Sequence, residues 1–400
     1  MEDCQLLKAP SRIHRRSVLK SLAGIAVAGA LPAALAGLEK PAPKTASINP
    51  KWYGFNLMEY FSTDPDWMKY FPFESGHFQE DDFRWMRDWG FNWVRLPMDY
   101  RFWTDANDPM QIREKDVEPI DRAIRLGEKY GVHVNVSLHR APGYCILDGM
   151  DEKFTKIHIT PERSNMFSSS SALDAFVHQW VYFAGRYAAI SSKKLSFNLV
   201  NEPIDFVGKE TEATGKEYVR VARAAIAGIR GKDHARLIVT DGYPSANSPI
   251  PDLYDANIVQ SCHDYSPYQL TCYQCEWVRP ASDGLPVPTW PLQDAQGKVI
   301  ADKHTIEEQF RPWTEPAQHG VPIHFGEMGC NRYTSPDVVY AWINDTLDMI
   351  GSLNSGWALW NLRGSNGIVD TNRPGTQYKD WHGHKLDFTL LSILQSKMKL

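Results

Sequence analysis

The sequence predicts an α/β protein in which residues 51–400 form a single domain, a (β/α)8 TIM barrel. Three patterns lead to this fold class. Short apolar runs alternate with longer segments of helical periodicity along the chain. Several of these runs are continuously apolar, which is typical of parallel strands buried on both faces. Unusual polar residues recur where the runs end, and in a barrel all of these positions open onto the same face.

Eight runs are expected to be strands, and they lie at Tyr53–Leu57, Trp93–Leu96, His133–Leu138, Leu195–Val200, Arg236–Thr240, Ile258–Ser261, Pro322–Phe325 and Gly356–Trp360. Helical patterns are clearest at Asp82–Trp89, Pro119–Tyr130, Ala172–Ala189, Lys216–Ile229, Ile306–His319 and Pro336–Ile350. Eight strand–helix units over roughly 300 residues match the barrel. A doubly wound sheet is the alternative, and it is weakened because no glycine-rich phosphate loop follows the first strand.

The first 36 residues are expected to be a twin-arginine export signal and not part of the fold. Arg15 and Arg16 precede an apolar run rich in alanine and glycine, and Ala34-Leu35-Ala36 resembles a cleavage site. A membrane anchor is the alternative, but the run is short for a membrane span. The sequence therefore predicts cleavage after Ala36, a linker at 37–50, and a periplasmic or extracellular protein.

The charge of the chain argues against nucleic acid as a partner. The first 36 residues carry a net +3, so the remainder of a chain with total charge −5 carries −8. Nucleic-acid binding needs a basic face, whereas an acidic surface suits a neutral substrate. Beyond the export machinery we expect no stable membrane partner, because no later stretch of the sequence has the pattern of a membrane span.

Five cysteines remain after the signal, so at least one thiol must be unpaired. Cys272 and Cys275 could form a zinc half-site, but no second Cys/His pair stands nearby. A local disulfide or two reduced thiols is the better interpretation. The sequence predicts neither a metal nor a cofactor.

Two glutamates stand directly after apolar strands. Glu202 follows Asn201 and precedes Pro203, and Glu327 follows Gly326. A carboxylate at the end of a buried strand is costly unless it has a partner or a chemical role. Two carboxylates that face each other are what glycoside hydrolysis needs, and retaining enzymes hold them ~5–5.5 Å apart. A loop glutamate in a salt bridge is the alternative for Glu202.

Other polar or aromatic residues share these strand-end positions. Arg95 needs an acidic neighbour inside the barrel, and Glu327 is the expected one. His139 and His263 are interpreted as site residues, with satisfied core histidines as the alternative. Four further carboxylates near strand ends are interpreted as structural or peripheral, and they are Glu59, Asp99, Asp241 and Asp264.

Taken together, these motifs resemble glycoside hydrolase family five, the cellulase-like retaining β-glycanases. The resemblance runs from about Trp52 to Leu394 and rests on six stretches in order: 91–97 (FNWVRLP), 137–139 (SLH), 201–203 (NEP), 263–265 (HDY), 326–327 (GE) and 357–360 (WALW).

The resemblance implies a role for each matched residue. Glu202 would be the acid/base and Glu327 the nucleophile, hydrogen-bonded by Arg95 and Tyr265. Asn201 would bind the sugar 2-hydroxyl. His139 and His263 would contact sugar hydroxyls or the acid/base, and Trp360 would be the stacking floor of the subsite.

The expected function is therefore retaining hydrolysis of β-1,4-glucan within the chain, with a polysaccharide or oligosaccharide as substrate. Mannan, β-1,3-glucan or an exo-acting β-glucosidase remain as alternatives on the same machinery. A non-catalytic polysaccharide-binding barrel is a further alternative, disfavoured because the full catalytic set is present. The long segment 264–305 is expected to be functional because loops of that length usually are.

Overall fold

The computed structural model describes residues 50–70, 78–146, 155–204, 212–275, 277–278 and 284–398. The expected export signal, and all of the expected linker except residue 50, lie outside these ranges. Within them, eight strands form the barrel, with bounds β1 Tyr53–Asn56, β2 Trp93–Asp99, β5 His133–Ala141, β7 Leu195–Asn198, β8 Leu237–Asp241, β9 Val259–Asp264, β12 Ile323–Met328 and β13 Trp357–Leu359.

The eight strands pair in parallel and close on themselves. The order is β2-β1-β13-β12-β9-β8-β7-β5, and β5 pairs back onto β2. In the closing pair, Trp93 lies opposite His133 and Leu96 opposite Val136. All eight expected strands are therefore present, and the (β/α)8 barrel is confirmed.

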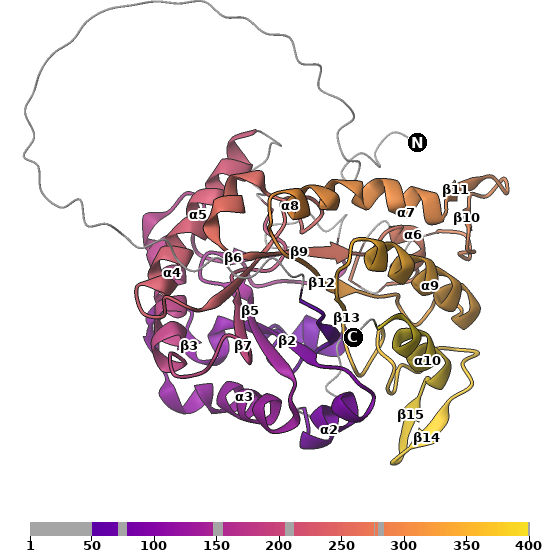
Figure 1. Cartoon of the computed structure of the whole chain (residues 1–400), viewed down its shortest axis with the longest axis horizontal. Coiled ribbons are helices and arrows are strands. Elements are labelled where there is room, and N and C mark those ends of the chain that lie inside the picture. The colour runs from indigo at the N-terminus through magenta and orange to yellow at the C-terminus, as the bar shows by residue number, and fades with distance from the viewer. Residues whose placement is uncertain are drawn as a thin grey trace, which may run out of the picture. The chain divides into compact units, whose positions relative to one another are not determined.

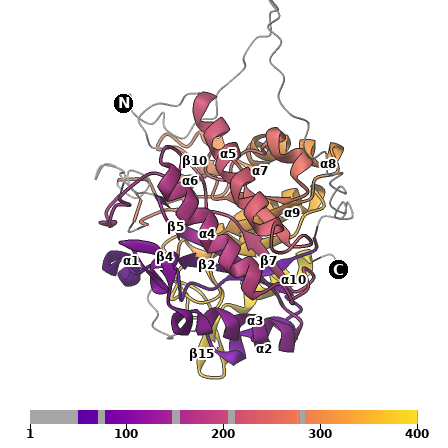
Figure 2. The same ribbon diagram turned by 90° about the vertical axis from the view of Figure 1, so that its left-hand side faces the viewer.

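Helices lie around the strands (Figure 1). The main ones are α2 Glu80–Asp88, α3 Glu118–Tyr130, α4 Ser170–Arg186, α5 Glu212–Arg230, α7 Lys303–Phe310 and α9 Pro336–Ser352. Helix α3 illustrates their formation, because it buries Ile120, Ile124 and Gly127 on one face and ends at Gly131 in the left-handed conformation. Helices α4 and α5 lie side by side on the outside of the barrel (Figure 2).

One expected helix is wrong in its continuity. The segment Ile306–His319 consists of helix α7, a 3-10 turn at Arg311–Thr314 and the short helix α8 Glu315–Gln318. Pro312 and Pro316 are the second residues of the pieces that begin at Arg311 and Glu315. Each lacks an amide hydrogen and is tolerated only in the first turn of a helix, so a new helical piece starts just before each proline.

Several short elements were not expected from the sequence. They are helices α1 Pro65–Tyr70, α6 Tyr268–Thr271 and α10 Phe388–Lys397, the strand β6 Tyr144–Cys145, and the pairs β3 Thr104–Asp105 with β4 Asp108–Ile112, β10 Leu292–Gln293 with β11 Val299–Ala301, and β14 Lys379–Trp381 with β15 His384–Leu386. The segment 264–305 thus carries α6, β10 and β11 before α7 begins.

The cysteines of the described ranges are buried. Cys272 is a free thiol, as are Cys262 and Cys330, so it does not form a local disulfide with Cys275. Among the described residues, no helix combines the length and apolar character that crossing a bilayer requires.

Candidate active site

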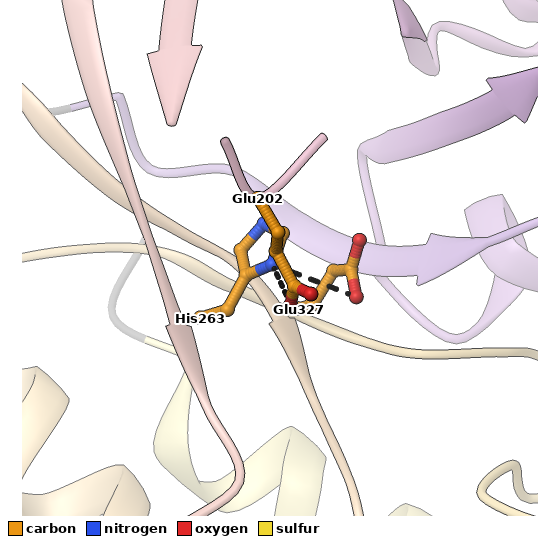
Figure 3. A group of neighbouring side chains, drawn as sticks. All are labelled: Glu202, His263 and Glu327. Carbon is orange, nitrogen blue, oxygen red and sulfur yellow. Dashed lines mark hydrogen bonds and ion pairs between the residues drawn. The ribbon is translucent and has the colours of Figure 1, made fainter. Parts of the chain in front are cut away.

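The residues expected at the site come together at the carboxyl ends of the strands. Parallel strands of a barrel all end at one face, so side chains far apart in sequence can meet there. In Figure 3, the side chains of Glu202, His263 and Glu327 point toward one another. The expected residues take these positions: Arg95 in β2, His139 in β5, Asn201 and Glu202 after β7, His263 in β9, Tyr265 after β9, Glu327 in β12 and Trp360 after β13.

Glu327 is a buried carboxylate surrounded by donors. Its side chain is 3% exposed and accepts hydrogen bonds from Arg95 Nη1 and, at 3.1 Å, from Tyr265 Oη. Nδ1 of His263 lies 3.6 Å from the same carboxylate. Burial raises the pKa of Glu327 to about 7, against the lowering effect of His263 and Arg95. These fixed donors stabilise the ionised carboxylate and hold it in one orientation.

Gly326 permits this placement. A Cβ atom at position 326 would lie 2.6 Å from Ser261 Oγ on the neighbouring strand β9. The pairing of β12 with β9 also shifts register between Phe325 and Glu327. The glycine therefore allows the two strands to approach closely where the carboxylate is delivered.

Arg95 connects the strands beneath the carboxylates. It is 1% exposed, and its Nε donates to Asn198 Oδ1 at 2.9 Å. Nη1 donates to Asn56 Oδ1 at 3.1 Å, and Nη2 donates to Ser137 Oγ at 3.0 Å and to Asn201 Oδ1 at 2.8 Å. A guanidinium with several fixed acceptors has little freedom to move, so Glu327 is held by a rigid partner.

Glu202 is held by its backbone as well as by its side chain. Its φ is 43°, in the left-handed region, which costs a non-glycine residue about 1–3 kcal/mol. Its amide hydrogen is donated to Asp241 Oδ2 at 2.9 Å, and Tyr144 Oη donates to its carbonyl at 2.6 Å. Oε1 lies 2.7 Å from His263 Nδ1, and the side chain is 17% exposed. The carboxylate is thus aimed at Glu327 while remaining open to solvent.

The two carboxylates are close enough to act on one bond. One atom each from Glu202, His263 and Glu327 lie within 4.8 Å of one another. Such a trio could also hold a cation, although the oxygens of Glu327 already accept hydrogen bonds from Arg95 and Tyr265. The separation of the carboxylates is comparable to the ~5–5.5 Å of retaining glycosidases.

His139 and Trp360 lie beside this centre in an aromatic group. The ring of Phe61 lies 4.3 Å from that of His139 and 5.5 Å from that of Trp360. Burial, together with the charge of Arg95, keeps the pKa of His139 well below its ordinary value, so the ring is neutral. Nδ2 of Asn201 is buried without a hydrogen-bond partner in the described part of the chain, which leaves a donor for a ligand.

The family described as Cellulase (glycosyl hydrolase family 5) matches residues 46–366. The chain belongs to this family. It is therefore an O-glycosyl hydrolase.

Known proteins similar to this family 5 hydrolase agree with its assignment. A solved structure described as a glycoside hydrolase is 36% identical and covers 87% of this chain and 99% of its own, with a TM-score of 0.76. Endoglucanase C of Acetivibrio thermocellus is 22% identical and covers 78% of this chain and 90% of its own length. Cellodextrinase A of Ruminococcus flavefaciens is 25% identical, with coverage of 66% and 72%.

Of the two alternatives for Asp241 in this hydrolase, structural or peripheral, the structure has the first. Its side chain is fully buried at the end of β8 and contacts Glu202, with Arg95 at 3.9 Å and His263 at 3.4 Å. Asp99 does pair with Arg101, away from the carboxylates.

Five residues of the site were not recognised as such from the sequence, and they are Asn56, Ser137, Tyr144, Asn198 and Asp241. A signal existed for some of them. Asn56, Asn198 and Asp241 are polar residues that end β1, β7 and β8, and Ser137 lies within β5.

Proposed function

We propose that this hydrolase is a retaining β-glycosidase that cleaves β-1,4-glucan by double displacement, with Glu327 as nucleophile and Glu202 as acid/base. The observation that carries the proposal is the approach of the two carboxylates to within 4.8 Å, with Glu327 held by Arg95 and Tyr265. An inverting enzyme needs a wider gap, about 6.5–9.5 Å, to place a water between its carboxyl groups.

In the first step, a Glu327 oxygen attacks the anomeric carbon while the bond from that carbon to the leaving oxygen breaks. Glu202 gives its proton to that oxygen, and the sugar remains as an ester on Glu327. In the second step, water attacks the same carbon, Glu202 takes the proton of the water, and the Glu327 carboxylate leaves. The free Nδ2 of Asn201 would donate to the 2-hydroxyl, and Trp360 would support the sugar ring.

The substrate assignment rests on the sequence motifs and on relatives that are named as an endoglucanase and a cellodextrinase. Internal cleavage of β-1,4-glucan is the expected action. Mannan, β-1,3-glucan and end-acting β-glucosidase activity are the alternatives. Assays on these polysaccharides and on aryl glycosides, read for reducing ends and product length, distinguish between them.

Substitution of the nucleophile tests the mechanism. Glu327→Ala should fold as the wild type does and lose turnover, by about 10⁴-fold or more, because no covalent ester can form. Azide should restore activity on an activated aryl β-glycoside and give the α-glycosyl azide. NMR of the first product of the wild type should show the β anomer.

An α anomer as first product, or wild-type turnover by Glu327→Ala, would contradict the mechanism. Asp99→Asn is the matched control, because it alters a buried strand-end carboxyl that pairs with Arg101. No turnover of any substrate by the wild type would favour a barrel that only binds polysaccharide.

We also propose that the protein is exported by the twin-arginine route and acts outside the cytoplasm. The support is the sequence of residues 14–36 alone, with Arg15 and Arg16 before an apolar run.

A further inference from the structure

We propose that Asp241 is a positioning residue for the acid/base. One of its carboxylate oxygens fixes the backbone of Glu202 and also faces the imidazole that contacts the side chain of Glu202. The inference rests on the proposed role of Glu202. It adds a residue on β8 to the machinery that the sequence motifs indicated.

A single atom of Asp241 faces three site residues. Oδ2 accepts the Glu202 amide hydrogen at 2.9 Å, lies 3.4 Å from His263 Nε2 and 3.9 Å from Arg95 Nη2. The other ring nitrogen of His263, Nδ1, lies 2.7 Å from Glu202 Oε1. Asp241 therefore constrains Glu202 in two ways. It binds the backbone of Glu202 directly, and it faces the ring of His263, which contacts the Glu202 side chain.

Asp241 is itself held in place by hydrogen bonds to its side chain and to its backbone. Its Oδ1 accepts from Asn198 Nδ2 at 2.9 Å, and its carbonyl accepts from Tyr218 Oη at 3.1 Å. Asn198 in turn accepts from Arg95 Nε. The side chain of Asp241 is fully buried. It is a rigid anchor between the arginine that holds the nucleophile and the backbone that carries the acid.

The backbone conformation of Glu202 shows why such an anchor is needed. Glu202 adopts φ 43°, which a glutamate does not prefer, directly before Pro203. A strained conformation persists where surrounding contacts determine it. Asp241 accepts a hydrogen bond from the Glu202 amide, and Tyr144 donates one to the Glu202 carbonyl. Without Asp241, the amide hydrogen loses its buried acceptor and the backbone can relax, which swings the carboxyl away from the leaving oxygen.

The charges of the cluster fit the state before reaction. The cations Arg95 and protonated His263 balance the anions Glu327 and Asp241, so the buried cluster is neutral when Glu202 carries its proton. Burial by itself lowers the pKa of His263, but Glu327, Asp241 and Glu202 raise it above the ordinary value. The titratable groups that face Glu327 are Arg95 from β2, Glu202 after β7, Asp241 from β8, and His263 and Tyr265 from β9 and its following loop.

The test is Asp241→Asn, measured with aryl β-glycosides that run from dinitrophenyl to unsubstituted phenyl leaving groups. We expect kcat/KM to fall on the order of 10²-fold for the poor leaving groups, which need protonation, and little for the dinitrophenyl substrate. The acidic limb of the pH profile should also move to lower pH, because removing the charge of Asp241 lowers the pKa of Glu327. Asp99→Asn, at the end of β2, should change neither the leaving-group dependence nor the limb.

Equal losses for all leaving groups, or an unmoved acidic limb, would overturn the proposal and leave Asp241 a structural residue. In a Glu202→Gln background, Asp241→Asn should add no further dependence on the leaving group, and an additive effect would also overturn it. If Glu202→Gln itself keeps full activity on poor leaving groups, the proposed function fails instead.

Should Asp241→Asn not fold, nitrogen-15 NMR of wild-type histidines decides, with His263 assigned through His263→Gln. If the His263 ring carries protons on both nitrogens at a pH above the ordinary histidine pKa, the proposal is supported. If the ring is neutral at that pH, the proposal is overturned.

Discussion

Glu327 combines two opposing influences at a single carboxyl. Burial raises its pKa to about 7, while Arg95 and Tyr265 donate hydrogen bonds to the ionised form. As the proposed nucleophile it must be ionised, so activity should be lost as the pH falls through the pKa of this group. The acidic limb of kcat/KM should therefore lie near neutrality and not near the pKa of an ordinary glutamate.

Tyr265→Phe should move that acidic limb upward. The substitution removes a donor at 3.1 Å from Glu327, and loss of a hydrogen bond to the charged form raises the pKa. We expect kcat/KM to fall by about 10-fold at neutral pH, since a hydrogen bond to a charged group contributes about 1.5–3 kcal/mol. Full pH profiles of both proteins check this. Tyr340→Phe, which removes a hydroxyl bound to Asp387, is the control. A limb that stays in place would show that Tyr265 does not stabilise the carboxylate.

Glu59 should govern part of the pH dependence of stability. Burial raises the pKa of this carboxyl to about 8 from 4.5. A raised pKa in the folded state means that stability is fully present below about 4.5 and is lost as the pH rises to about 8. Glu59→Gln should therefore unfold less readily than the wild type at alkaline pH. The difference in unfolding free energy should grow by about 1.4 kcal/mol per pH unit in that window. Urea unfolding across the window measures it. The exposed Glu128→Gln should show no such trend, and a pH-independent difference for Glu59→Gln would refute the assignment.

At the scale of elements, the strands were predictable and the small additions were not. A strand buried on both faces needs a continuous apolar run, so each barrel strand leaves a signal in the sequence. Two-residue strands such as β6, β10 and β3 are too short for any periodicity to show. Helix α10 follows β13, the last barrel strand, and buries Leu390, Leu391 and Leu394. A short apolar group of this kind does not by itself distinguish a helix from a strand.

The candidate site likewise has residues that the sequence could predict and residues that it could not. The carboxylates Glu202 and Glu327 could be picked out because the motifs around them distinguish them from other acidic residues. Asp241 could not be picked out in this way, because Asp99 and Asp264 also end strands. Only the closed barrel shows which of these carboxylates faces His263.

The segment after β9 reaches across to loops from other strands. The ring of Trp277 lies 6.2 Å from that of Trp67 after β1, and Thr155 Oγ1 donates to the Trp277 carbonyl at 3.0 Å. Trp67 contacts Phe61, which packs on Trp360. The segment is therefore tied to the aromatic group next to the expected sugar-binding floor.

Trp277→Ala should change how oligosaccharides are bound more than how the bond is broken. We expect KM for cello-oligosaccharides to rise about 10-fold, the effect of losing an aromatic contact of roughly 1.4 kcal/mol, with kcat on small aryl glycosides nearly unchanged. Product lengths should shift as well. Trp290→Ala is the matched control, because that tryptophan lies in the same segment but bonds to Asp345 on α9. Identical products and KM values for the two variants would exclude a role for Trp277 in binding.

For the whole molecule, the distribution of charge agrees with the proposed export signal. The segment 1–36 carries +3 and the rest of the chain −8, so cleavage would release an acidic protein. Acidic net charge keeps a protein soluble and away from anionic polymers, which suits action on a neutral glycan.

Replacing Arg15 and Arg16 with lysines should keep the protein in the cytoplasm. The expected route reads the arginine pair itself, so conserving the charge should not conserve export. Cell fractionation with activity and N-terminal sequencing of the exported form measures this, and Lys8→Arg serves as the control outside the motif. Normal export of the double variant would indicate the general secretory route.

The contacts of Arg95 decide where this protein can be redesigned. One guanidinium satisfies acceptors on β1, β5, β7 and β12 at once. A library randomised at Asn56, Ser137 or Asn198 would therefore return mostly dead clones, since every change leaves a buried charge short of a partner. Diversity placed in the loops beyond the strand ends has no such penalty. New specificities are best sought in these loops, by exchanging them while the residues of the barrel strands are kept.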